Sequence, residues 1–378
     1  MFFWVDESGH TGANLFDEDQ PVLYYGVLLS AVNLDIVAEP ISAAFRRRLG
    51  VSRLHAAELG NQRLPSLISA LVALRRRCDI RFDLHRVAKS DHAIICFFDQ
   101  VFDHGVNPAI TWSGYWTPLR YVLLIKLARL FTDELAKIAW DARISTNSER
   151  AHAGLVTVCE GLRSRIDLLP DARSKQLIGD TLAWASANPK EIHYNVADKD
   201  AILQITPNVI GFQAVMHGIA SRIAKRRRQA SRILVDQQLQ FNGAQKTLAD
   251  FYSSARAIPW ATGPGLPVMD LTHMPTVEIE IGSSVSSGGL ELADIYLWVF
   301  KRYLEGKALA PELLELLRGQ MHRGRTDEIS LNAIAKRWSE HFKSRPEPDQ
   351  LPPEQIERAR ELLHVDEKRR QQALRGDA

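Results

Sequence analysis

The feature that most constrains the fold is the first stretch of the chain, MFFWVDESG, in which an apolar run ends on two acids. Phe2–Val5 has the aromatic and β-branched residues that favour a buried β-strand. Asp6 and Glu7 follow without a break, and an acid is seldom buried without a partner. Gly9 permits a sharp turn immediately afterwards. We therefore expect a core strand that presents a carboxylate at the edge of a sheet.

The rest of the chain predicts an α/β fold. The further expected strands are Val22–Val32, Cys78–Val87, Arg232–Asp236 and Thr276–Gly282. The helices expected outside the middle of the chain are Leu34–Leu49, Gln62–Arg77, Pro207–Arg228, Gly243–Ala257 and Gly288–Gly306. Three strands come first, and helices and strands alternate later, which indicates parallel strands joined by crossover helices.

The middle and the end of the chain have the pattern of helical additions to this core. A chain of 378 residues is long enough for two or three domains, or for one domain with a large insertion. We expect residues 1–89 and 207–306 to form the core, 90–206 a helical insertion and 307–378 a helical C-terminal extension. The extension includes a Pro-rich linker near 343–353 and a polar helix at Glu354–Arg375. The insertion is expected to shape a cleft or to form a homodimer interface, and the last helix to dock a partner protein.

Composition narrows the cellular setting. The three cysteines, Cys78, Cys96 and Cys159, have no CxxC or CxxH spacing, so we expect neither a zinc site nor a disulfide framework. Asp6 interrupts the first apolar run too early for a signal peptide, and Val22–Val32 is too short to span a bilayer. We therefore expect a cytoplasmic protein with no membrane partner. The formal net charge is only +2, so binding to nucleic acid would need basic residues gathered locally.

Three acids fall at the ends of expected core elements. Asp6 ends the first strand, Asp236 ends the strand ILVD, and Asp294 lies on the otherwise apolar helix LELADIYLW. The carboxyl ends of parallel strands open on one crevice, so these side chains are expected to lie close together. Carboxylates this close repel one another unless a cation sits between them. Hard divalent ions such as Mg²⁺ take oxygen ligands of this kind.

This order of elements and acids resembles the ribonuclease H-like superfamily. More closely, the chain is similar to a bacterial family within it, the domain-of-unknown-function family numbered 3800. The blocks that carry the resemblance are DESG at Asp6–Gly9, LHAAEL at Leu54–Leu59, ILVDQ at Ile233–Gln237 and SSGGLELADIYLW at Ser286–Trp298. It implies a ribonuclease H-like mixed sheet with an acid on the first strand, one at the end of the fourth strand and one on the final helix of the core.

The resemblance also implies a nuclease that uses Mg²⁺ or Mn²⁺, with two ions that activate water and stabilise the leaving oxygen of a phosphodiester. The metal ligands and catalytic residues that it implies are Asp6, Asp236, Asp294 and Glu58, with Ser8 and His55 as supporting groups. The substrate would be RNA or DNA. The setting that it suggests is bacterial, such as defence against phage or a mobile element.

The fourth acid is the least fixed member of this set. The superfamily usually places a glutamate on the helix after strand three, but Pro207–Arg228 contains no acid. Glu58 is the expected substitute, and it shares a helix face with His55 if that segment is helical. Glu7 is an alternative, although strand alternation points it away from Asp6. Glu291 either adds a ligand or faces solvent.

Basic and aromatic residues are the other candidates for contact with nucleic acid. The expected binding run is Lys225, Arg226, Arg227 and Arg228, at the end of the helix that leads into the Asp236 strand. Cations at a helix C-terminus are also stabilising for dipole reasons alone. The segment TWSGYWTP, Thr111–Pro118, could stack on unpaired bases, but we expect it to pack the insertion.

Two alternatives to a nuclease stay open from the sequence. The fold could serve as a non-catalytic module that binds nucleic acid or protein, with its acids kept for structure. The same metals could also support a phosphoesterase that acts on a nucleotide. Loss of activity in EDTA would indicate a metal-dependent nuclease or phosphoesterase and would exclude the non-catalytic binding module.

Overall fold

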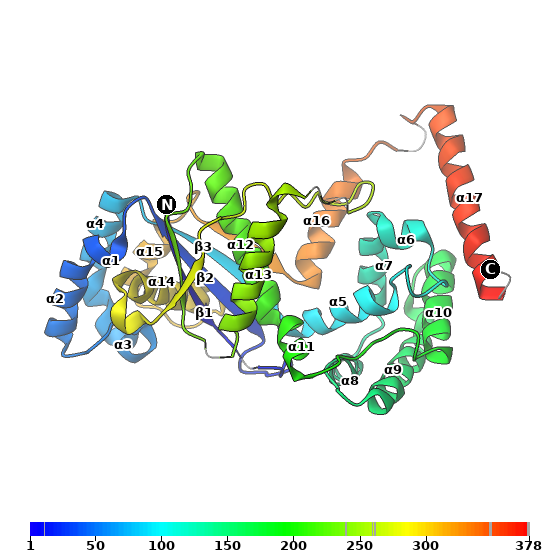
Figure 1. Ribbon diagram of the computed structural model, residues 1–378, viewed down its shortest axis with the longest axis horizontal. Helices are drawn as coiled ribbons and strands as arrows, with labels where there is room; N and C mark the ends of the chain where they lie inside the picture. The colour runs from blue at the N-terminus through cyan, green and yellow to red at the C-terminus, as the bar shows by residue number, and fades with distance from the viewer. Residues whose placement is uncertain (11, 239, 259, 261, 348–349, 376–378) are drawn as a thin grey trace.

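The centre of the protein is a six-stranded mixed sheet (Figure 1). The computed structural model describes residues 1–10, 12–238, 240–258, 260, 262–347 and 350–375. In spatial order, the strands are β5 (Ile279–Gly282), β4 (Arg232–Asp236), β1 (Phe2–Ser8), β2 (Val22–Ser30), β3 (Arg81–Ala88) and β6 (Arg325–Ile329). The prediction of an α/β fold is confirmed.

Strand β1 lies in the middle of the sheet between two kinds of neighbour. It pairs antiparallel with β2 and parallel with β4, and β4 pairs parallel with β5. The register joins Val5 to Val235, so Asp6 and Asp236 follow at the same level of neighbouring strands. Gly9, with φ 98°, then turns the chain away from β1 at a point where a side chain would collide with the backbone oxygen of Val22.

One face of the sheet is covered by helices from both ends of the core. They are α1 (Leu34–Val37), α2 (Glu39–Leu49), α3 (Ala56–Arg63), α4 (Ile68–Cys78), α14 (Gly288–Leu304) and α15 (Leu314–Arg318), with the 3-10 turns η1 (Leu64–Leu67), η4 (Ser284–Ser286) and η5 (Pro311–Leu313). Their apolar side chains pack on Trp4, Leu28, Phe82 and Leu234. Helix α14 crosses β1 and β2 directly. A side chain at Gly289 would collide with the Trp4 indole, so glycine permits this close approach.

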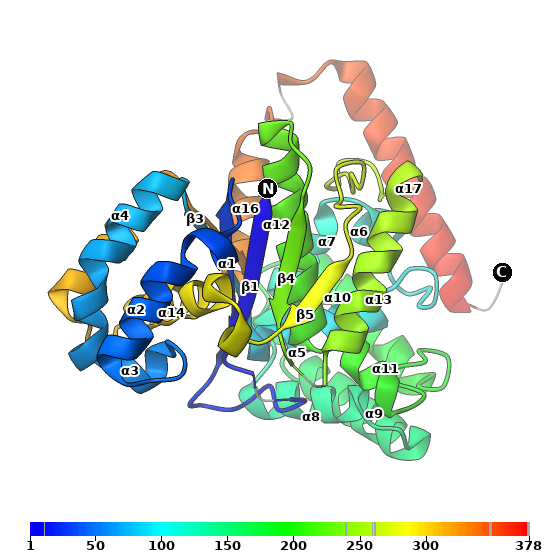
Figure 2. The ribbon, with the colours of Figure 1, turned by 60° about the vertical axis from the view of Figure 1, so that its left-hand side comes forward.

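The opposite face is covered by α12 (Pro207–Arg226) and α13 (Asn242–Ser254), which ends in η3 (Ala255–Ala257). Figure 2 shows the two helical layers on either side of the strands. Because strand residues alternate between faces, Phe3 and Val5 contact this second layer, whereas Trp4 faces α14. Asp6 and Asp236 therefore lie on the same side of the sheet as α14.

The insertion between β3 and α12 has a hydrophobic core of its own. Its elements are α5 (Lys89–Val101), α6 (Trp112–Trp116), α7 (Leu119–Ala128), α8 (Asp133–Arg143), α9 (Ser148–Arg163), η2 (Ile166–Leu168), α10 (Ala172–Ala187) and α11 (Lys199–Gln204). Within the segment TWSGYWTP, Tyr115 is buried in this core and Trp116 packs against it, whereas Trp112 is 43% exposed. The segment thus packs the insertion mainly through Tyr115 and Trp116.

The segment after residue 306 differs from the expected helical extension. Arg325–Ile329 forms β6, which pairs parallel with β3 and completes the edge of the sheet. Helix α16 (Leu331–Lys343) then stacks Trp338 on Tyr121 of α7, with ring centroids 4.1 Å apart. Helix α17 (Pro353–Arg375) docks on the insertion through Asp366, which accepts hydrogen bonds from the backbone N–H groups of Trp112 and Ser113. The segment therefore joins the sheet to the insertion.

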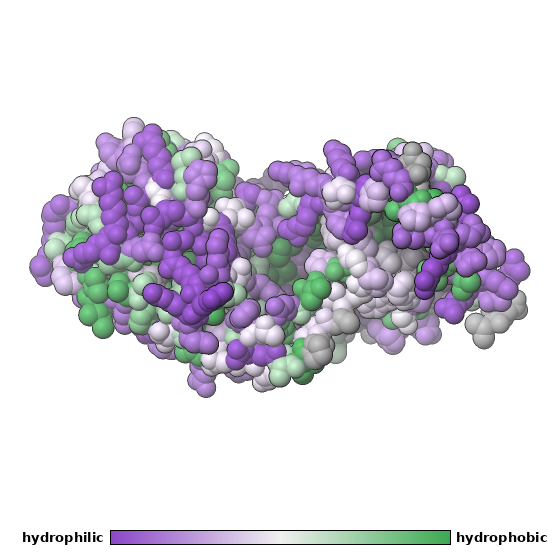
Figure 3. Space-filling model, turned by 90° about the horizontal axis from the view of Figure 1, so that it is seen from above, coloured by the Kyte–Doolittle hydropathy of each residue, from purple (hydrophilic) through white to green (hydrophobic). Residues whose placement is uncertain are grey.

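A membrane-spanning helix needs a minimum length and hydropathy, with which the helices of the described residues can be compared. Among the described residues, no helix is both long enough and apolar enough to cross a bilayer. Seen from above, hydrophilic side chains cover most of the lobe that contains α1–α4 (Figure 3).

Candidate active site

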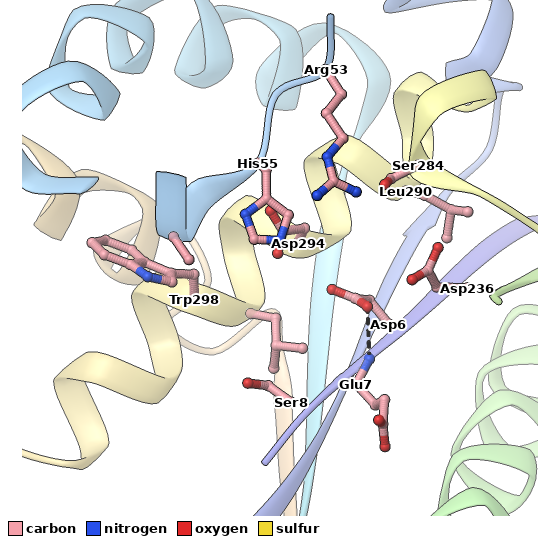
Figure 4. Close-up of a pocket in the computed structure, with 12 residues that line it drawn as sticks. Asp6, Glu7, Ser8, Arg53, His55, Asp236, Ser284, Leu290, Asp294 and Trp298 are labelled. Atoms are coloured by element: carbon pink, nitrogen blue, oxygen red, sulfur yellow. Dashed lines mark hydrogen bonds between the residues drawn. The ribbon is translucent and has the colours of Figure 1, made fainter. Parts of the chain in front are cut away.

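The three aspartates predicted from the sequence border one cavity of about 220 Å³ at the carboxyl ends of β1 and β4. Asp6 comes from β1, Asp236 from the end of β4 and Asp294 from α14. Figure 4 shows their carboxylates directed towards the same space. The cavity is lined by Asp6, Glu7, Ser8, Arg53, His55, Ala57, Asp236, Ser284, Leu290, Asp294, Leu297 and Trp298.

Backbone N–H groups hold two of the three carboxylates, those of Asp6 and Asp294. Glu7 donates to Oδ1 of Asp6 at 2.8 Å, and Ala56 donates to Oδ2 of Asp294 at 2.6 Å. At Asp236, the backbone N–H groups of Gln237 and Ser284 lower the pKa of the carboxylate and so oppose the effect of burial. These bonds orient the carboxylates without neutralising them, because a backbone N–H carries no net charge.

The electrostatics of the cavity disfavour the ionised carboxylates. Burial raises the pKa of Asp6 well above its usual value, and the charges of Asp294 and Asp236 raise it further. Burial also raises the pKa of Asp236 and that of Asp294. The charges of His55 and Arg53 oppose this rise at both residues. A cation among the three carboxylates would favour their ionised forms and so oppose this effect.

Glu7 is placed differently from Asp6. It borders the cavity, but its carboxylate points away from the three aspartates (Figure 4) and accepts a hydrogen bond from Nδ2 of Asn208 at 2.8 Å. Burial raises the pKa of Glu7 to about 7. Strand alternation thus separates the two acids, as the sequence predicted.

Ser8 and His55 both border the cavity. The hydroxyl of Ser8 accepts a hydrogen bond from Nζ of Lys301 at 3.0 Å, whereas a backbone N–H group holds Asp6. His55 immediately precedes α3, and its ring lies beside Asp294 (Figure 4).

Glu58 is not brought to the cavity. Its side chain is 59% exposed, and it lies 3.1 Å from Nη2 of Arg53 and 3.8 Å from Nδ1 of His55. The structure thus gives no support to Glu58 as the fourth ligand, and instead places it behind two residues of the cavity wall.

Glu291 is neither a ligand nor solvent-facing, which corrects both expectations. Its side chain is fully buried, its Oε1 accepts the backbone N–H of Leu54 at 2.8 Å, and its Oε2 pairs with Arg46 at 2.6 Å. Asp294, one helical turn later, accepts the N–H of Ala56. The two acids of α14 together fix the loop that carries Arg53 and His55.

The run Lys225–Arg228 lies away from the carboxylates. It begins in the last turn of α12 and continues beyond it, and β4 then begins at the level of Phe2, at the opposite end of the strands from Asp6. Arg226 pairs with Asp79 at 2.9 Å. The expectation that this run lines the crevice is wrong, because the chain still has to traverse β4 before it reaches Asp236.

Arg53 and Trp298 are among the residues of the cavity wall that were not predicted as site residues. Arg53 stands two residues before His55, and Trp298 stands four residues after Asp294. Residues four apart share a helix face, so the position of Asp294 was a signal for Trp298. The signal for Arg53 was weaker, since the loop that carries it has no regular period.

The oxygen donors of the three aspartates are of the type that Mg²⁺ and Mn²⁺ prefer. Within the described ranges, however, no three His, Cys, Asp or Glu side chains already form a group that could hold a metal ion. The residues therefore fit such an ion in their chemistry, although they are not gathered into a ready-made ligand set. No protein-family model, curated protein or solved structure matches this chain.

Proposed function

We propose that this protein is a divalent-metal-dependent nuclease that hydrolyses phosphodiester bonds. The observation that carries the proposal is the meeting of Asp6, Asp236 and Asp294, from three separate elements, in one cavity. Among the described residues, none of the ion pairs includes any of these three carboxylates. Acids kept only for structure are usually paired, so this group indicates a cationic ligand.

The resemblance to the ribonuclease H-like superfamily supports the same conclusion. It implies acids on the first strand, at the end of the fourth strand and on the last core helix, and Asp6, Asp236 and Asp294 occupy β1, β4 and α14. We propose that the fold is of this type and that Mg²⁺ or Mn²⁺, as a pair of ions, is the cofactor.

In this proposal, Asp6, Asp236 and Asp294 would hold the cations. The bound cations would supply a more acidic water and stabilise charge on the leaving oxygen. Arg53 would bind a phosphate oxygen at the mouth of the cavity, where its guanidinium points (Figure 4). His55 would exchange a proton with the leaving oxygen through its imidazole, and Glu58 would orient that ring from behind.

The direct test combines cleavage with metal binding. Labelled RNA and DNA, single-stranded and duplex, would be incubated with protein in Mg²⁺, Mn²⁺ or EDTA. We expect cleavage that EDTA abolishes and Mn²⁺ restores. In parallel, Mn²⁺ at about 100 times its Kd should stabilise the wild type by about 2.7 kcal/mol, and Asp294→Asn by much less.

The binding module gives a different pattern. It would bind nucleic acid equally well in EDTA, cleave none of the probes and show no Mn²⁺-dependent rise in Tm. That combination would overturn the proposed activity.

A further inference from the structure

Trp298 is an unusual part of the cavity wall. From Ser287 to Val299, every residue of α14 and its cap is buried except Asp294 and Trp298. These two stand four residues apart, on one face of the helix, and both border the cavity. Figure 4 shows the indole beside His55 and Asp294. A catalytic carboxylate and a large flat ring are thus presented side by side.

Within the chain, the indole has a cationic neighbour and an apolar one. It packs against the core on the α14 side, and the guanidinium of Arg302 lies 4.9 Å from its ring centroid. A wall that only had to enclose carboxylates and a cation would gain more from polar groups, because an apolar ring does not solvate charge. The ring therefore points to a ligand that offers a flat apolar face.

Cations continue along the same helix beyond the indole. Lys301 stands seven residues after Asp294, and its Nζ donates to Ser8, which shares a strand face with Asp6. Arg302 follows directly. The acids, the aromatic ring and the cations thus form a series along one side of α14 and β1. A polynucleotide carries the matching series of phosphate, base and next phosphate.

We propose that Trp298 stacks on an unpaired base next to the scissile phosphate, so that single-stranded nucleic acid is the substrate. This proposal rests on the proposed nuclease function. Bases inside a duplex are covered on both faces by their neighbours, whereas an unpaired base offers a face to an aromatic side chain. Stacking tolerates any base, so the preference concerns strandedness more than sequence.

The experiment measures binding separately from cleavage. An Asp294→Asn background keeps the probe intact, and labelled single strands of about twelve nucleotides, RNA and DNA, are compared with the matched duplexes. Trp298→Leu removes the flat ring but retains apolar packing, and Trp298→Phe restores a ring. Trp112→Leu is the matched control, because Trp112 is 43% exposed but lies on the insertion and not on the cavity wall.

We expect tighter binding of single strands than of duplexes. Trp298→Leu should weaken single-strand binding by about 5- to 100-fold, while Trp298→Phe recovers most of the loss and Trp112→Leu changes little. A strand of the same length without bases should bind wild type and Trp298→Leu alike, because it has no base to stack. Comparing the two proteins on the two kinds of strand forms a thermodynamic cycle. The cycle assigns the loss of affinity to the missing contact with the base rather than to altered folding.

Equal affinity of Trp298→Leu and wild type for single strands would overturn the inference, even if cleavage occurs. An equal loss with the abasic strand would also overturn it. If no probe is cleaved by the wild type but the stacking cycle holds, the inference about the ligand stands and the proposed hydrolysis fails.

Discussion

Two aspartates on the same sheet, Asp83 and Asp6, have opposite surroundings. Asp83, on β3, is 2% exposed, and Arg222 binds both of its oxygens. The backbone N–H of Arg325 adds a further hydrogen bond at 2.9 Å. Asp6, on β1, has Asp236 and Asp294 as its charged neighbours. The charge of Asp83 is thus balanced by an arginine of the same chain, whereas the charge of Asp6 would be balanced by a bound cation.

The same contrast recurs at other structural acids. Asp35 accepts hydrogen bonds from Arg232, Trp4, Ser287 and the backbone of Gly289, and so joins β1, β4 and α14. Acids that hold the fold together thus pair with arginines or accept several hydrogen bonds. An acid without such partners is the better candidate for chemistry.

The largest effect should follow from replacing the carboxylate of Asp6 or of Asp83 by an amide. Asp6→Asn should reduce cleavage by at least about 1,000-fold, on the order of 4 kcal/mol, because a cation ligand is lost. Its Tm without metal should be unchanged or higher, because a repelling charge is gone. Asp83→Asn should instead destabilise the fold by about 3 kcal/mol and leave cleavage by the folded fraction nearly intact. Cleavage assays and urea unfolding would be carried out on both variants. A large loss of stability in Asp6→Asn, together with a large loss of cleavage in Asp83→Asn, would contradict the prediction.

The second effect concerns pH. Because burial raises the pKa of Glu7 from 4.5 to about 7, the folded state favours its protonated form. The free energy of unfolding should therefore fall as pH rises from about 4.5 to 7, by about 3 kcal/mol from this group. Asp6, Asp236 and Asp294 shift in the same direction. Urea unfolding in EDTA across this range should show the fall, and Glu7→Gln should flatten it. An unchanged slope in that variant would exclude Glu7 as a source.

The third effect separates the two acids of α14. Glu291→Gln should destabilise the protein by about 2 kcal/mol, because it leaves Arg46 without its buried partner. Cleavage should fall mainly through KM, because the loop with Arg53 is then held at Leu54 by a neutral acceptor in place of a charged one. Asp294→Asn should reduce kcat instead. Steady-state kinetics on both variants would distinguish the roles, and a kcat loss in Glu291→Gln equal to that in Asp294→Asn would contradict them.

The smallest effect is expected at Glu58. Its exposed carboxylate pairs only with Arg53 and His55 among the described residues, and exposed pairs contribute up to about 1 kcal/mol. Glu58→Gln should therefore reduce cleavage by less than about 5-fold and leave stability unchanged. A loss as large as that of Asp6→Asn would instead make Glu58 the fourth ligand.

Local patterns accounted for the centre of the molecule. Phe2–Val5 and Ile233–Val235 are apolar and β-branched enough to predict strands, and the order of elements then brought Asp6 and Asp236 to one edge. Within the expected helical insertion, caps at Pro118 and Thr132 mark where α7 and α8 begin, and helical periodicity alone does not reveal such boundaries.

Contacts between residues that are far apart in the chain could not be predicted from the sequence. Strand β6 was not predicted, because its sequence RTDEI is charged and lacks an apolar alternation. A strand at the edge of a sheet with exposed faces does not need such a pattern. Glu291 could not be assigned, because Arg46 lies 245 residues away along the chain. Side-chain pairs of this kind depend on packing and leave no local signal.

The central position of β1 has a consequence for the order in which the protein is made. β1 is synthesised well before its neighbour β4, which begins at Arg232. At about 5–20 residues per second, one edge of β1 therefore waits roughly 10 to 45 s for its partner. The insertion, with its own core, can fold during that interval. Asp294 follows later still, so the three carboxylates can meet only after α14 has been made. Until then, a nuclease of this design would lack one of its carboxylates and would be inactive beside its own messenger RNA.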